Sequence, residues 1–281
     1  MTEQLDPMTR LWEGKMRMTD GKNDSTAQNN HTRVEGEELL LCAPTVCGFV
    51  LREKVLARMP IEQLSEPVWK PATFDKLVVP MKTKRLIRTT VKTCLNQPAA
   101  SSVDIVSTRG NGIVVILHGK PGTGKTLTVE AVGNDLRRPV FSIAISDLGV
   151  DASSVEPRLR TYLEIAEIWG CIVLIDEADV FLARRSEHNV FSSALVGALL
   201  KVLERHNSPI FLTTNRLNVF DDAMRSRASL IVEYPDLGWR ERAQLWKTFL
   251  DMDEVVRTPY DIRSLSRYKL NGRNVPSLCL S

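Results

Sequence analysis

One stretch constrains the fold of this chain more than any other: Gly119-Lys120-Pro121-Gly122-Thr123-Gly124-Lys125-Thr126. It satisfies the pattern G-x-x-x-x-G-K-[ST], in which the glycines let the backbone aim its N–H groups at phosphate oxygens. The β-branched run from Ile113 to Leu117 precedes it and a helical pattern follows, as a phosphate-binding loop requires. The alternative is a glycine-rich turn that merely joins a strand to a helix. The complete pattern in this context favours the phosphate-binding loop.

Side chains of this loop have predicted roles of their own. Lys125 is expected to contact the β and γ phosphates of ATP, and the Thr126 hydroxyl to bind Mg²⁺. The other predicted nucleotide-binding residues of the loop and the helix start are Gly119, Pro121, Gly122, Thr123, Gly124 and Leu127.

A second apolar run, Cys171 to Ile175, ends in the acids Asp176 and Glu177. A buried parallel strand that ends in acids places them at the carboxyl edge of its sheet, where open α/β folds bind ligands. We expect Asp176 to bind the nucleotide's Mg²⁺ through its water shell and Glu177 to deprotonate the attacking water. Two acids that only solvate a strand end are the alternative, but the phosphate-binding loop upstream favours the catalytic interpretation.

Polar residues also follow a later run, Ile210 to Thr213. Asn215 is predicted to hydrogen-bond the γ phosphate or the attacking water, although an Asn at this point is often a turn residue.

Two arginines, Arg225 and Arg227, end the next short helical segment. Arginines inserted into a neighbour's site can stabilise a transferring phosphoryl group. From the pattern alone, the stronger interpretation is that both arginines only interact with the helix dipole at the C-terminal end of this segment.

Strand-like and helix-like segments alternate from Gly112 to Tyr234. A capping box from Ser153 to Glu156 and a stripe of apolar residues at helical spacing predict a helix that reaches Trp169. Such alternation predicts a parallel sheet covered by helices on both faces. The predicted strands are Ile113–Leu117, Val140–Ile145, Cys171–Ile175, Ile210–Thr213 and Leu230–Val232.

Composition divides the chain into four predicted parts. Residues 1–38 are polar and without periodicity, which predicts disorder. Residues 39–70 are read as a small strand-containing appendage, and residues 71–235 as the main α/β domain. Residues 236–281 show helical periodicity only, in the stripe that begins at Trp239, and are read as a helical lid.

The composition argues against several partners. The 37 basic and 34 acidic residues leave a net charge of +3, so we do not expect nucleic acid as a partner. The five cysteines form no C-x-x-C pair, which argues against zinc or a disulfide framework. Neither a signal-peptide core nor an uninterrupted apolar run of the roughly 18 residues that a membrane span needs is evident. The expectation is a soluble intracellular protein of the cytoplasm or nucleus.

Taken together, these motifs resemble the AAA+ family of oligomeric ATPases. Leu117–Thr126 is similar to its Walker A motif, Leu174–Asp179 to Walker B, Thr213–Arg216 to sensor 1, and Phe220–Arg227 to the second region of homology. Flanking segments, Leu39–Phe49 and Tyr234–Leu237, resemble a group of large fungal AAA+ ATPases.

The resemblance implies a P-loop NTPase fold, a three-layer αβα sandwich whose parallel sheet has strand order 5-1-4-3-2, with a helical lid. It also implies ATP and Mg²⁺ as ligands and a ring, commonly a hexamer, whose sites are completed by the next subunit. By similarity, Arg227 is the arginine finger, Arg225 is the second candidate, and Arg273 of the lid reaches the γ phosphate in cis. Val79 and Pro80 are expected near adenine.

Two departures from the family pattern keep other functions open. Members that thread polypeptides carry an aromatic residue in a pore loop, where this chain has Ser146–Asp151. Pro276 falls where the family continues a helix, which predicts a shortened lid. The leading hypothesis is an ATPase that remodels a protein or complex. The alternatives are a nucleotide-binding interaction protein with little hydrolysis and, from Asp176–Asp179, a helicase, which would need a second domain and a basic face.

Overall fold

The computed structural model describes residues 43–96, 112–148, 152–179, 197, 199–203, 206–217, 222–250 and 262–272. The chain divides into two compact units between Pro67 and Val68. None of the described helices has the length and apolar character that crossing a lipid bilayer would require.

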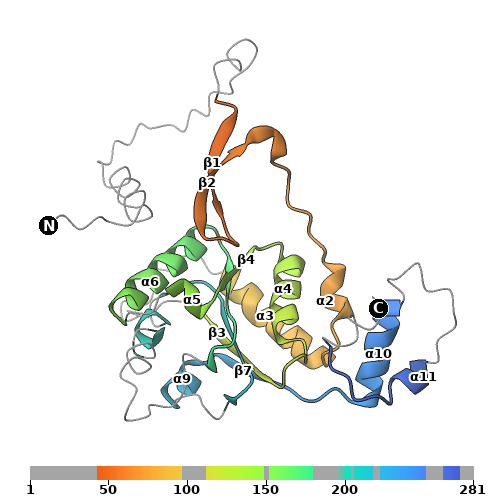
Figure 1. Ribbon diagram of the computed structural model, residues 1–281. Helices are drawn as coiled ribbons and strands as arrows, with labels where there is room; N and C mark the ends of the chain where they lie inside the picture. The colour runs from red at the N-terminus through yellow and green to blue at the C-terminus, as the bar shows by residue number, and fades with distance from the viewer. Residues whose placement is uncertain are drawn as a thin grey trace. The chain divides into compact units, whose positions relative to one another are not determined.

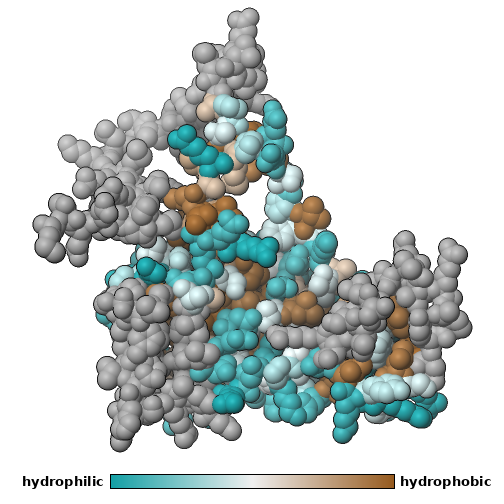
Figure 2. Space-filling model, in the orientation of Figure 1, coloured by the Kyte–Doolittle hydropathy of each residue, from teal (hydrophilic) through white to brown (hydrophobic). Residues whose placement is uncertain are grey.

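The first unit contains a β-hairpin in the segment for which strands were expected. Strand β1 (Thr45–Val50) pairs antiparallel with β2 (Val55–Pro60), and the short 3₁₀ turn η2 (Ile61–Gln63) follows. The hairpin surface in Figure 2 mixes brown and teal, because apolar side chains such as Val46 and Val55 remain exposed. Two strands alone cannot bury both of their faces.

The second unit is built on a five-stranded parallel sheet. Its strands are β3 (Val114–Gly119), β4 (Val140–Ile143), β5 (Ile172–Ile175), β6 (Ile210–Thr214) and β7 (Leu230–Tyr234). They lie in the order β4-β5-β6-β3-β7. Numbered along the chain this is 2-3-4-1-5, which is the predicted order 5-1-4-3-2 read from the opposite edge. The predicted αβα fold class is therefore confirmed.

Helices cover both faces of this sheet (Figure 1). On one side lie α2 (Ala72–Lys76), α3 (Met81–Asn96) and α4 (Lys125–Leu136); on the other lie α5 (Ile145–Leu148), α6 (Ala152–Ile168) and α9 (Asp222–Arg227). Every residue of β5 and β6 is buried, as expected for parallel strands between two helical layers.

The core beneath the phosphate-binding loop is apolar and closely packed. Val115 and Leu117 of β3 are fully buried with Val129 and Val132 of α4 in one cluster. Burying side chains of this size stabilises the fold by about 1.5–3 kcal/mol each. The helix that follows the loop is thereby held firmly against the strand that precedes it.

Several element boundaries differ from the sequence prediction. The predicted strand Val140–Ile145 ends at Ile143, because the Asp147 carboxylate accepts a hydrogen bond of 2.6 Å from the Ala144 N–H and the chain turns into α5. Helix α6 already begins at Ala152, so Ser153 lies inside the helix rather than at its N-cap.

Helix α3 was not among the predicted elements. Its buried residues Lys84, Ile87, Val91 and Cys94 recur at helical spacing, so the signal was present in the sequence. Lys84 interrupts the apolar pattern, and in the fold its ammonium donates to the Asp75 carbonyl at 2.8 Å.

Two helices follow β7 in the segment read as a lid. They are α10 (Trp239–Leu250) and α11 (Ile262–Leu265), and the Arg242 guanidinium of α10 donates to the Ser266 carbonyl just after α11 at 2.8 Å. The predictions for Pro276 and Arg273 lie outside the described residues.

Candidate nucleotide-binding site

A cavity of about 360 Å³ opens at the carboxyl edge of the parallel sheet. Its walls come from the loop after β3, the acids after β5, the end of β6 and the start of the segment that leads to α10. This volume lies within the range of small-molecule sites, and the position is where open α/β sheets bind ligands.

The phosphate-binding loop has the backbone that its glycines allow. Gly119, Gly122 and Gly124 have φ values of 151°, 76° and 95°, which residues with a Cβ rarely adopt. The whole predicted set from Pro121 to Leu127 lines the cavity, whereas Gly119 lies at the base of the loop. The loop therefore turns its backbone towards the cavity at the start of α4.

Lys125 is the buried cation of this loop. Its ammonium donates to the Gly119 carbonyl at 2.7 Å, the Lys120 carbonyl at 2.8 Å and the Asn215 amide oxygen at 2.9 Å. The structure thus brings together two residues that lie far apart in sequence, Lys125 and Asn215. Asn215 itself is exposed and lines the cavity.

The acid Asp176 faces the threonine at the start of α4. The Thr126 hydroxyl lies 3.1 and 3.2 Å from the two carboxylate oxygens of Asp176, so oxygen ligands from β5 and α4 meet at one point. The Thr213 hydroxyl also donates to Asp176, and it accepts a 3.0 Å hydrogen bond from the Glu177 N–H. Both acids are therefore positioned through β6.

Thr213 is a site residue that the sequence analysis did not single out. It is almost fully buried in β6, directly after three apolar residues, and its carbonyl accepts from the Ala178 N–H at 2.8 Å. A hydroxyl in an apolar β-strand was the available signal. Next to it, Glu177 is exposed, lines the cavity and has a φ of 53°, a conformation that is uncommon outside glycine.

The cavity also has an apolar part. One wall is formed by residues before α3 and the other by residues of the β7–α10 connection and of α10. These apolar lining residues are Leu77, Val78, Val79, Leu237, Leu245 and Phe249. The predicted adenine neighbour Val79 is among them and Pro80 is not. An apolar slot beside a phosphate-binding loop suits a flat heterocyclic base.

The chain continues past α11 onto the loop itself. The Gly272 N–H donates to the Gly122 carbonyl at 2.8 Å. Asn271 packs so closely beside Gly122 that a Cβ added to Gly122 would lie 2.7 Å from the Asn271 Cγ. The segment preceding Arg273 is therefore in backbone contact with the phosphate-binding loop.

Two predicted catalytic residues lie away from the cavity. The Arg225 guanidinium donates to the Leu217 carbonyl at 2.6 Å, and that of exposed Arg227 donates to the Ala223 carbonyl at 3.1 Å. Neither lines the cavity. Within this chain, the arginines of α9 do not join the loop, the acids and the amide.

Comparisons with known proteins match part of this chain to one family. Residues 115–236 match the model of the ATPase family associated with various cellular activities (AAA). The chain is 32% identical over 185 residues to the ATP-dependent zinc metalloprotease FtsH of Parabacteroides distasonis. It is 30% identical over 154 residues to the CD-NTase-associated protein 6 of Escherichia coli and 28% identical over 185 residues to a putative cell division cycle ATPase of Plasmodium falciparum.

These relatives are matched only in part. The aligned regions cover 58%, 48% and 63% of this chain, but 26%, 52% and 14% of the respective relatives. The matched region contains the phosphate-binding loop, the acid pair, Asn215 and the α9 arginines. On the family match, the fold and the sheet order together, residues 115–236 of this chain form an AAA ATPase domain.

Proposed function

We propose that this protein binds ATP with Mg²⁺ in the cavity and hydrolyses it, and that hydrolysis is used to remodel a protein or complex. The observation that carries the proposal is the convergence of Lys125, Asp176, Glu177 and Asn215 on one cavity from three separate segments. Each has the chemistry that one part of phosphoryl transfer to water needs.

Binding would use both parts of the cavity. The triphosphate would lie along the loop, with Lys125 exchanging its carbonyl partners for phosphate oxygens, and the base would occupy the apolar slot. Thr126 and Asp176 supply hard oxygen ligands side by side, which fits Mg²⁺. When bound, the ion would neutralise charge on the β and γ phosphates.

Hydrolysis would then depend on two side chains at the strand ends. Glu177 would accept a proton from water as the water oxygen bonds to the γ phosphorus, and the bond from that phosphorus to the bridging oxygen breaks. The products are ADP and inorganic phosphate. Asn215, held by Lys125 at 2.9 Å, would orient the water or the γ phosphate.

Assembly into a ring would complete the site. Arg225 and Arg227 lie on α9 outside the cavity, so a role in phosphoryl transfer would require the site of a neighbouring subunit. We propose Arg227, which is exposed, as the finger and a homo-oligomeric ring, commonly hexameric in this family, as the assembly. Arg273 is proposed to approach the γ phosphate from the lid.

The proposal is tested with Lys125→Ala and Glu177→Gln, measuring ATP binding and phosphate release separately. Lys125→Ala should weaken binding at least about tenfold, since it removes a charge-assisted contact to phosphate. Glu177→Gln should bind ATP normally but release phosphate about 100-fold more slowly, as expected for loss of a general base. Glu233→Gln, an exposed acid of β7 outside the cavity, is the control and should change neither.

The same measurements separate the alternatives. Unchanged turnover in Glu177→Gln would overturn the assignment of the base. If the unmodified chain binds ATP without releasing phosphate at any protein concentration, it acts as a nucleotide-binding interaction protein instead.

A separate experiment tests whether Arg227 completes the site of a neighbouring subunit. Arg227→Ala and Lys125→Ala chains should each be inactive alone, and mixing them should restore part of the activity if Arg227 acts on the neighbouring site. No recovery under conditions where sedimentation shows assembly would rule out a finger in trans.

A further inference from the structure

The end of β7 touches the phosphate-binding loop at both of its ends. Tyr234, the last residue of this strand, pairs in register with Gly119, where the loop begins. Its side chain is 5% exposed and reaches under the other end of the loop, where its hydroxyl lies 2.8 Å from the Thr128 hydroxyl of α4.

The hydrogen bonds beneath the loop have a fixed direction. The Thr128 hydroxyl donates its single proton to the Gly124 carbonyl at 2.9 Å, so it can only accept from Tyr234. Burial raises the pKa of Tyr234 to about 12, which keeps this phenol protonated and a donor at every pH the protein meets. The chain of donors runs from Tyr234 through Thr128 to Gly124.

Holding the Gly124 carbonyl determines where the next amide points. The peptide bond between Gly124 and Lys125 is planar and trans, so its N–H points opposite to its carbonyl. With the carbonyl held inward by the Thr128 N–H and hydroxyl, the Lys125 N–H is turned towards the cavity. Gly124 itself has a φ of 95°, which residues with a Cβ rarely adopt.

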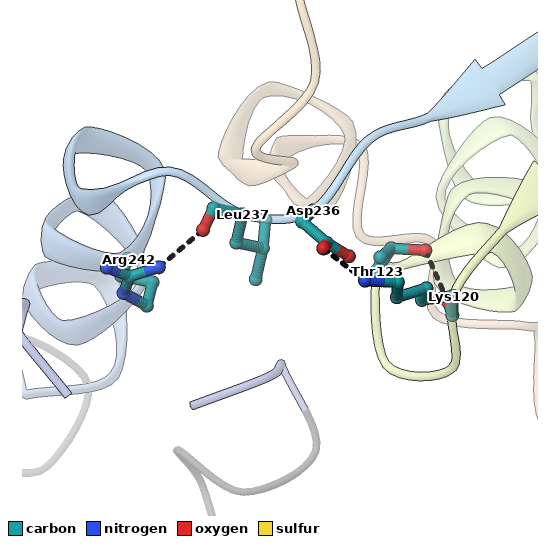
Figure 3. A network of polar contacts seen from close by, with 5 residues as sticks. All are labelled: Lys120, Thr123, Asp236, Leu237 and Arg242. Carbon is teal, nitrogen blue, oxygen red and sulfur yellow. Dashed lines mark hydrogen bonds and ion pairs between the residues drawn. The ribbon is translucent and has the colours of Figure 1, made fainter. Parts of the chain in front are cut away.

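The first end of the loop is held by close packing. A Cβ at Gly119 would lie 2.2 Å from the Tyr234 carbonyl oxygen, so the two backbones are in direct contact. Beyond Tyr234, Asp236 forms an ion pair with Lys120, and the Leu237 carbonyl accepts from Arg242 of α10 (Figure 3). Within the loop, the Thr123 hydroxyl donates to the Lys120 carbonyl at 2.8 Å.

We infer that Tyr234 is a positioning residue for the nucleotide: through Thr128 it sets the orientation of the Gly124–Lys125 peptide that faces the β phosphate. The ion pair of Lys120 with Asp236 is a weaker second contact, because both side chains are more than 60% exposed. The inference rests on the proposed function, since it requires that the loop binds the phosphates of ATP.

The test compares Tyr234→Phe with the unmodified protein in the full chain. The substitution removes one hydroxyl and keeps the ring that fills the core. The dissociation constants for ATP and ADP should both rise about threefold to tenfold, the range expected for one hydrogen bond. Both should rise by the same factor, because the affected amide faces a phosphate that the two nucleotides share.

Substitutions of Thr128 provide a conservative variant and a measure of its energetic coupling to Tyr234. Thr128→Ser keeps the hydroxyl and should bind ATP within about twofold of the unmodified protein, whereas Thr128→Val should resemble Tyr234→Phe. Because both act through one chain of hydrogen bonds, the double variant should bind little more weakly than either single variant. The control is Tyr162→Phe, which removes a hydroxyl that donates to the Asp147 carbonyl at 3.4 Å outside the site.

The outcomes separate this inference from the proposed function. If the unmodified protein binds neither ATP nor ADP, the proposed function itself fails. If it binds them and Tyr234→Phe binds equally well, the positioning role is wrong. Equal losses in Tyr234→Phe and Tyr162→Phe, tracking their melting temperatures measured without nucleotide, would show a purely structural role and also overturn the inference.

Discussion

A single buried histidine makes the stability of this domain sensitive to acid. His206 precedes β6 and is 5% exposed, and burial lowers the pKa of its imidazole to about 4 from an ordinary value of 6.5. The unfolded chain therefore takes up a proton at a pH where the folded chain does not. Between these two values the unfolded state binds more protons, so the free energy of unfolding falls as the pH falls.

The predicted loss is about 3 kcal/mol between pH 6.5 and pH 4 from this residue alone. His206→Leu should remove that part of the pH dependence, and it also shifts the overall stability because the replacement has a different shape. Denaturant unfolding at several pH values, compared as slopes rather than absolute stabilities, gives the measurement. Parallel slopes for the two proteins would show that His206 does not titrate as its burial predicts.

At the scale of elements, the phosphate-binding loop is sensitive to a Cβ for two different reasons. A Cβ added to Gly119 would lie 2.2 Å from the Tyr234 carbonyl oxygen of β7, whereas a Cβ added to Gly124 would meet no neighbouring atom within 4 Å. Gly119→Ala must therefore displace the end of β7, whereas Gly124→Ala costs only the strain of a positive φ.

The expected destabilisation is about 1–2 kcal/mol for Gly124→Ala and more than about 3 kcal/mol for Gly119→Ala. Gly197, an exposed helical glycine with open space around it, is the matched control, and its replacement by Ala should be neutral or slightly stabilising. Denaturant titration of the three variants measures the free energy of unfolding of each and so their order of stability. A Gly119→Ala protein as stable as Gly124→Ala would contradict the close contact with Tyr234.

The elements that could be predicted are those whose pattern lies within one short stretch of sequence. β-Branched runs identified all five strands of the sheet, and the spacing around Lys125 and Asp176 identified the residues that converge on the cavity. What sequence alone did not reveal depends on contacts across the fold. Tyr234 and Thr128 are 106 positions apart, and no local pattern indicates that their side chains meet.

The apolar slot was missed for the same reason, apart from Val79, which was expected near adenine. Leu245 and Phe249 continue the amphipathic pattern of α10, so the sequence indicates a helix face but not the cavity that this face covers. Helix α3 was missed because a lysine occupies a buried position, and only the fold shows the Asp75 carbonyl that accepts from it.

The chain divides into two compact units between Pro67 and Val68, and the nucleotide site belongs to the second. The cavity is lined entirely by residues from Leu77 to Gly272, which all belong to the second unit. The connection around Pro67 and Val68 has no regular secondary structure, and Val68 is 82% exposed. Cutting the chain there removes neither a site residue nor a strand of the five-stranded sheet.

We therefore predict that a chain cleaved at a protease recognition site inserted between Pro67 and Val68 keeps its nucleotide site. The dissociation constant for ATP should stay within about twofold, since the loop, the acids and the apolar slot remain on one fragment. The same insertion left uncleaved controls for the added residues, and calorimetry before and after cleavage reports whether the larger fragment still unfolds cooperatively. A large loss of affinity on cleavage alone would show that the first unit supports the site, and the β1–β2 hairpin would then be part of the nucleotide-binding machinery.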